Sequence, residues 1–168
     1  MTTRADYTAE EWRTLSQLPV AVSLAVITSG KSNPMQRVRE LTSMVQTLED
    51  TRRQQPANEL VTAVAVADGE RPGDGARAAG ALPSPDLSEG GAELQRQAVA
   101  QCLQAAAILA AKSTPAEAEG YKRWVVAIGR KVAEAAKEGG FLGIGGGPVS
   151  PEETETLNAV TAALELSP

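Results

Sequence analysis

Apolar residues recur every three or four positions along most of the chain, and this spacing places them on one face of an α-helix. The first stripe consists of Trp12, Leu15, Pro19, Val22 and Val26. The second consists of Val38, Leu41, Val45 and Leu48. Comparable stripes follow within 60–67, 94–109, 121–132 and 157–164, and no stretch alternates as a half-buried strand does. The pattern predicts an all-α protein with about six helices in a single compact bundle.

Three segments carry the signature of a helix start, in which a Ser or Thr side chain accepts a hydrogen bond from a backbone amide and a Glu three residues later reaches back. They are Thr8–Glu11, Thr114–Glu117 and Ser150–Glu153. In the last two, proline occupies the first helical position, where its missing N–H is not needed. Asn33-Pro34 predicts a fourth start. Pro19 falls inside the first apolar stripe, and we expect it to bend or interrupt that helix.

The chain has the length of one domain, and we expect residues 1–168 to form a single helical domain. Residues 69–91 are rich in glycine and proline and show no apolar period, which predicts a flexible internal loop. A functional lid is the alternative for this segment.

The order of elements on the two sides of this loop is similar. Lys31-Ser-Asn-Pro and Lys112-Ser-Thr-Pro stand at equivalent places between two apolar helices. Two related three-helix halves about a pseudo-twofold axis are one interpretation, and the general similarity of Ala- and Val-rich helices is the other.

Two short motifs add a family resemblance. They are Ala67-Asp68-Gly69-Glu70 and the helix start Val149-Ser150-Pro151-Glu152-Glu153. With these motifs the chain resembles the TerB-like helical proteins of tellurite resistance, which implies an all-α fold with related halves. The resemblance implies no metal site here, because residues 139–148 hold no carboxylate to complete the acidic cluster of that family.

Charge and cysteine content narrow the class of protein. Twenty-one acidic residues against 16 basic ones give a net charge of -5, which disfavours a nucleic-acid partner. No apolar run is long enough for a membrane span and no secretory signal is evident, so we expect a cytoplasmic protein. The single Cys102 lies among apolar positions and reads as a core thiol rather than a nucleophile.

The chain contains no histidine, which removes the commonest general base and the commonest transition-metal ligand. The carboxylate pairs Glu10-Glu11 and Glu152-Glu153 could serve an acid/base reaction or a Mg²⁺ ion. Each pair also opens a helix, where a negative charge is favourable, and we take them as caps. The sequence therefore predicts no catalytic residue, no metal site and no cofactor, and it favours a protein that is not an enzyme.

Two groups of residues remain as candidate ligand- or partner-binding surfaces. Phe141, Leu142 and Ile144 follow a glycine helix end, and they form either a buried plug or, if exposed, a partner-binding surface. Trp12, Tyr121 and Trp124 are either core residues or the lining of a pocket between helices. Lys122, Arg123, Arg130 and Lys131 form a basic face, which is either solvated and paired with acidic neighbours or a small anion patch.

The leading hypothesis is a non-catalytic helical protein that acts through protein–protein interaction, as an oligomer or a component of an assembly. The alternative is a helical module that binds a small ligand or a metal ion, because a glycine-rich segment before a helix start can present amides to an anion.

Overall fold

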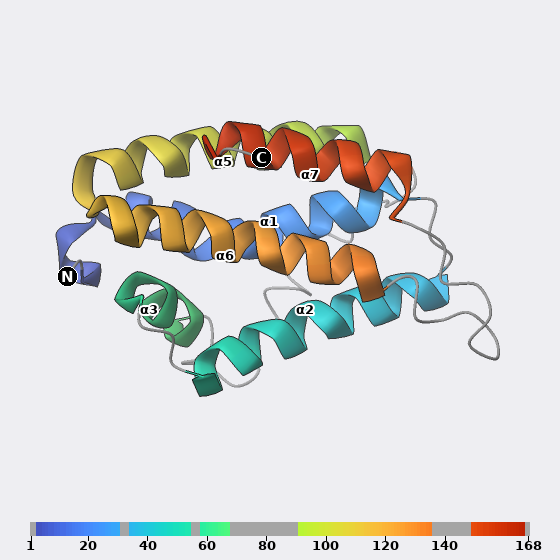
Figure 1. Cartoon of the computed structure of the whole chain (residues 1–168), viewed down its shortest axis with the longest axis horizontal. Helices are drawn as coiled ribbons and strands as arrows, with labels where there is room; N and C mark the ends of the chain where they lie inside the picture. Colours follow the sequence, from blue (N-terminus) through green and yellow to red (C-terminus); the bar gives the residue numbers. More distant parts are fainter. Residues whose placement is uncertain (1–2, 31–33, 55–57, 68–90, 136–148, 167–168) are drawn as a thin grey trace.

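The computed structural model describes residues 3–30, 34–54, 58–67, 91–135 and 149–166. These residues form a 3-10 helix, η1 (Arg4–Asp6), and six α-helices. The α-helices are α1 (Ala9–Ser29), α2 (Pro34–Gln54), α3 (Glu59–Ala67), α5 (Gly91–Lys112), α6 (Pro115–Ala135) and α7 (Pro151–Ala163) (Figure 1). The described ranges contain no strand, which confirms the predicted all-α class.

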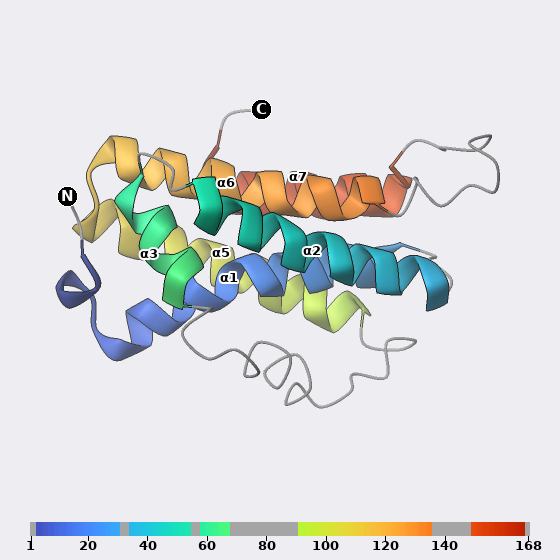
Figure 2. The ribbon, with the colours of Figure 1, turned by 90° about the horizontal axis from the view of Figure 1, so that it is seen from below.

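Helices α1 and α6 run through the centre of the bundle, and each contacts every other α-helix of the described part. Helices α5 and α7 cover one side of this pair, and α2 and α3 cover the other (Figure 1). Figure 2 gives the view from the side of α2 and α3. The compact bundle expected from the apolar stripes is therefore confirmed.

The helices form two sets of three, α1–α3 and α5–α7. The two sets have similar contacts between their own consecutive helices, but the contacts that one set makes with the other are not symmetric. Consecutive helices contact each other in both sets. Across the sets, α1 packs closely on α6 and α7, whereas α5 makes much less contact with α2 and α3. A duplication therefore stays a prediction, and the contacts between sets differ from those of an exact pseudo-twofold axis.

The predicted helix starts are confirmed in detail. In each of the three capping boxes, the Glu amide donates to the Ser or Thr hydroxyl, at 3.1–3.3 Å, and the Glu carboxylate accepts from the cap residue's amide. Helix α2 begins at Pro34, as expected. Because these starts depend on hydrogen bonds within four residues, the sequence alone locates them.

Pro19 lies inside α1 and does not end it. Its missing N–H removes the usual donor to the carbonyl of Leu15, four residues earlier. The hydroxyl of Tyr121, on α6, donates to that carbonyl oxygen at 2.5 Å. A side chain of the neighbouring helix thus replaces the lost backbone donor and allows α1 to continue.

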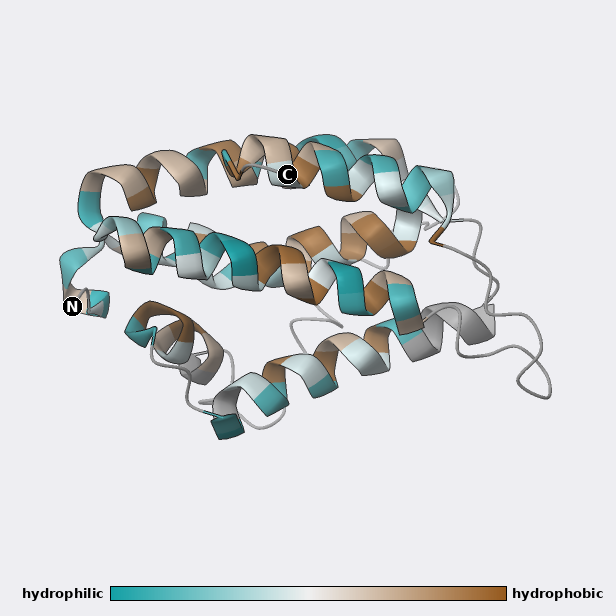
Figure 3. Ribbon diagram, viewed as in Figure 1, coloured by the Kyte–Doolittle hydropathy of each residue, from teal (hydrophilic) through white to brown (hydrophobic). Residues whose placement is uncertain are grey.

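The buried residues form two neighbouring clusters. The larger joins α1, α3, α5, α6 and α7, and the smaller joins the end of α1 with α2, α6 and α7. Both consist mainly of Val, Leu, Ile and Ala, as the low aromatic content implies. Along α6 and the coloured part of α2, hydrophobic and hydrophilic residues alternate along the ribbon, as in helices that bury one face (Figure 3). Cys102 is part of the larger cluster, and burial raises the pKa of its thiol to about 12, so it is a core residue.

One residue of the second predicted stripe was assigned to the wrong face. Val45 is 52% exposed, whereas Met44 and Leu48 are buried against α1, α6 and α7. Leu41, Met44 and Leu48 also have three- and four-residue spacing, so the apolar pattern of α2 permitted two stripes. The packing of α2 on α6 selects the one that contains Met44.

Two predicted segments lie outside the described residues. The glycine-rich segment with Phe141, Leu142 and Ile144 is one of them. The predicted loop 69–91 is the other, except that its last residue, Gly91, belongs to α5 as the first helical residue.

Candidate functional site

The three large aromatic residues proposed as a pocket lining lie in or against the larger core cluster. Trp12 packs on Tyr7 with ring centroids 6.0 Å apart. Tyr121 packs on Trp124 at 5.8 Å, and the Trp124 indole N–H donates to the Thr51 hydroxyl at 3.1 Å. Burial raises the pKa of the Tyr121 phenol well above its ordinary value, so this group stays protonated and donates to the α1 backbone. These contacts are those of interior packing residues.

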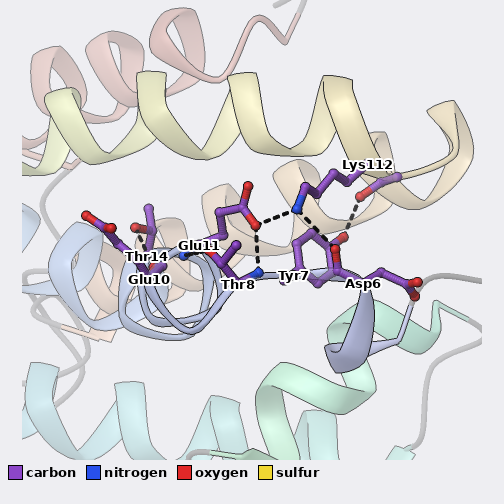
Figure 4. Close-up of polar contacts among 8 residues, drawn as sticks. Asp6, Tyr7, Thr8, Glu10, Glu11, Thr14 and Lys112 are labelled. Carbon is purple, nitrogen blue, oxygen red and sulfur yellow. Dashed lines mark hydrogen bonds and ion pairs between the residues drawn. The ribbon is translucent and has the colours of Figure 1, made fainter.

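Glu11 of the first carboxylate pair belongs to a polar cluster at the start of α1 (Figure 4). One carboxylate oxygen accepts the Thr8 amide at 2.7 Å and lies 2.6 Å from Nζ of Lys112. Lys112 also donates to the backbone carbonyl of Asp6 at 3.1 Å. The pKa of Glu11 lies below its ordinary value, mainly because its carboxylate bonds to the Lys112 ammonium; the hydrogen bond from the Thr8 amide lowers this pKa further. Glu11 is therefore an ionised cap and an ion-pair partner.

A second contact in the same place connects the chain start to the α5–α6 junction. The Tyr7 hydroxyl lies 2.7 Å from the Ser113 hydroxyl and shares a hydrogen bond with it (Figure 4). This bond and the bond from Lys112 to the Asp6 carbonyl each join residues 106 positions apart in the sequence. The arrangement fastens the N-terminal segment to the end of α5.

Glu153 of the second carboxylate pair also has a structural role. Glu153 is buried, caps α7 through the Ser150 amide and lies against the end of α1. A Cβ atom at Gly30 would come within 2.7 Å of the Glu153 carboxylate, so a larger residue there would require the Glu153 side chain to shift. Within the described ranges, no three His, Cys, Asp or Glu side chains are grouped as metal ligands.

The outward side of α5 is uncharged and includes the exposed amides of Gln97 and Gln104 as well as apolar residues. The buried stripe of this helix alone did not point to it. No charged residue occurs between Gln97 and Ala111, a stretch of about four turns. Four exposed residues repeat here with heptad spacing, and we call them the α5 face: Ala100, Leu103, Ala107 and Ala110. Leu103 is 56% exposed. The signal was present in the sequence as a second, uncharged stripe of the same helix.

A groove of about 530 Å³ lies beside α6 where α7 ends. We call it the α6–α7 groove, and its lining is Pro115, Ala118, Glu119, Lys122, Arg123, Val126, Ala127, Arg130, Thr161, Glu165 and Leu166. The groove contains three of the four residues of the predicted basic face and none of the three large aromatic residues. Two of those basic side chains have acidic partners: Lys122 lies 3.6 Å from Glu165, and Arg123 pairs with Glu119.

Along the described helices, none has the length and apolar character needed to cross a membrane. Comparison with known proteins found no family model that matches the chain, and no curated protein or solved structure matches it. The α5 face and the α6–α7 groove are therefore the two candidate binding surfaces of this bundle.

Proposed function

We propose that this protein has no catalytic role and acts through protein–protein interaction, as a homo-oligomer whose subunits join at the α5 face. The observation that carries the proposal is a solvent-exposed helix face without a charge over about four turns, in a chain of which 22% is charged. Surfaces of this kind are typical of protein contacts, because the centre of an interface is depleted in charged residues.

The spacing of the α5 face suits a second helix. Ala100, Leu103, Ala107 and Ala110 follow one another by three, four and three residues, as the contact positions of paired helices do. Alanine lets two helices approach closely, and Leu103 supplies a side chain that fits between alanines of the partner. A twofold dimer uses the same face on both subunits, so one uncharged stripe is sufficient.

The free energy that burial of the α5 face contributes to dimerisation is modest. Full burial of a Leu side chain contributes roughly 1.5–3 kcal/mol, so burial of the exposed part of Leu103 contributes about 1–2 kcal/mol per subunit. The alanines add smaller amounts. A dimer held mainly by this face is therefore weak, and its population depends on protein concentration.

Light scattering coupled to size exclusion tests the proposal across a concentration series. We expect the wild-type protein to approach the dimer mass and the Leu103→Glu variant to stay a monomer. Val45→Glu is the matched control, because Val45 is a comparably exposed apolar residue on another helix. A wild-type protein that is monomeric at every concentration contradicts the proposal, as does a Leu103→Glu variant that still dimerises.

The absence of catalysis is supported by the use of the candidate carboxylates. Glu11 and Glu153 cap helices and have partners within the fold. The relation to TerB-like proteins and the cytoplasmic location stay predictions from the sequence.

A further inference from the structure

Helix α7 is shorter than the helix beside it, and this difference creates the α6–α7 groove. Helix α7 has 13 residues and α6 has 21, and the two run antiparallel. Helix α7 therefore stops before the N-terminal turns of α6. Beyond Ala163 the chain turns, with Glu165 in the left-handed region at φ 56°, and ends its described course at Leu166 on the edge of the groove.

The groove has an apolar floor. Ala118 and Val126 of α6 are buried there, and Leu166 is partly buried on the opposite edge. The side chain of Lys122 is only 12% exposed, so its methylene stem contributes to the floor while its ammonium faces Glu165. An occupant would therefore need an apolar side.

The edge of the groove carries an excess of positive charge. Its lining has three basic and two acidic side chains, and each acidic one is paired with a basic one. Arg130 is exposed and forms no ion pair with any residue in the described part of the chain. In a protein of net charge -5, this edge is complementary to carboxylates.

We propose that the α6–α7 groove binds an acidic amphipathic helix of a partner protein. The lining residues of α6 run from Pro115 to Arg130 at three- and four-residue steps, which corresponds to a length of about 22 Å. Among the described residues, the site is lined by α6 and by the end of α7 and the residues after it, and its length fits a helix laid beside α6. Small molecules bind in sites that enclose most of their surface, and this groove does not. The occupant places leucine-like side chains on the floor and carboxylates beside Arg130.

A display selection tests this chemistry without knowledge of the natural partner. The probe is a library of amphipathic helices of about 18 residues, roughly 27 Å long. Its apolar side is fixed as leucines at helical spacing, and each flanking position is Glu or Lys at random. The immobilised wild-type protein selects from this library, and the expected result is enrichment of Glu at the flanks.

Two pairs of variants then locate the binding site of the enriched peptides. Ala127→Trp fills the groove and should lower affinity by about tenfold or more, whereas Ala159→Trp, an exposed position outside the lining, should leave it unchanged. Arg130→Glu should lower affinity for the acidic peptides by about tenfold at low salt, with a smaller difference at high salt. Arg13→Glu is its control at an exposed arginine on α1. Circular dichroism and thermal unfolding establish that each variant is folded.

Several outcomes would overturn the proposal. An enriched pool that is neutral or rich in Lys contradicts the charge assignment, and a selection without enrichment contradicts helix binding. If the affinity of the enriched peptides is unchanged in Ala127→Trp, or is lost in Leu103→Glu, the peptides bind outside the groove. A small carboxylate retained in native mass spectrometry and released by Ala127→Trp would assign the groove to a small ligand instead. Because the α5 face is a different surface, self-association and helix binding succeed or fail separately.

Discussion

The hydrogen bond from Tyr121 to Leu15 should be worth more than an ordinary buried hydroxyl contact, because Pro19 leaves the Leu15 carbonyl without its helical donor. Tyr121 is fully buried, so Tyr121→Phe leaves that carbonyl oxygen unsatisfied in the core. A buried polar group that is left without a hydrogen bond costs about 1–3 kcal/mol. In a chain of this size, each kcal/mol lowers the melting temperature by about 2–4 °C.

A double-mutant cycle separates this effect from simple loss of a hydroxyl. In a Pro19→Ala background, the amide of residue 19 can donate to Leu15 as in any helix. There, Tyr121→Phe should cost only about 0.5–1.5 kcal/mol, the ordinary worth of a hydrogen bond. We expect a coupling of about 1 kcal/mol between the two substitutions, measured by urea unfolding of all four proteins. Equal costs of Tyr121→Phe in the two backgrounds would refute the reasoning.

Two further predictions concern the end of α7 and the start of α1. Glu165 occupies a left-handed position that favours glycine. The free energy of unfolding of Glu165→Gly should therefore be about 1 kcal/mol higher than that of Glu165→Ala, which loses the same carboxylate. A lower stability of the glycine variant in chemical denaturation would contradict this assignment. For Glu11, the folded pKa is depressed, so its contribution to stability is present above the unfolded pKa and is lost as pH falls through the folded pKa. Lys112→Met should raise the pKa of Glu11 in an NMR titration and flatten the acid limb of the stability curve; an unchanged pKa would mean that the Lys112 contact does not hold in solution.

The two proposed binding surfaces differ in chemistry as well as place. The α5 face is uncharged and self-complementary, which suits a second copy of the chain. The α6–α7 groove combines an apolar floor with Arg130, which has no ion-pair partner among the residues that the structure describes, and this suits a partner of opposite charge. A protein with both surfaces would bind a second copy of itself through α5 and a different partner through α6.

The sequence by itself determined the fold class, the number of helices and the starts of α1, α2, α6 and α7. These depend on local interactions: the period of apolar residues along each helix, and capping bonds that span three residues, as from Thr8 to Glu11. The burial of Cys102 and of Tyr121 followed from the same period. The charge balance and the absence of histidine likewise needed no structure.

Only the tertiary structure decided which of several apolar stripes is buried. On α2 the packing selected Met44 over Val45, and on α5 it left Leu103 exposed, because both helices carry more apolar residues than one face requires. It also brought Tyr121 to the carbonyl that Pro19 leaves without a donor, 106 positions away in the sequence. The α6–α7 groove arises from the unequal lengths of two packed helices. Such features depend on the relative placement of whole helices, which no local pattern of residues encodes.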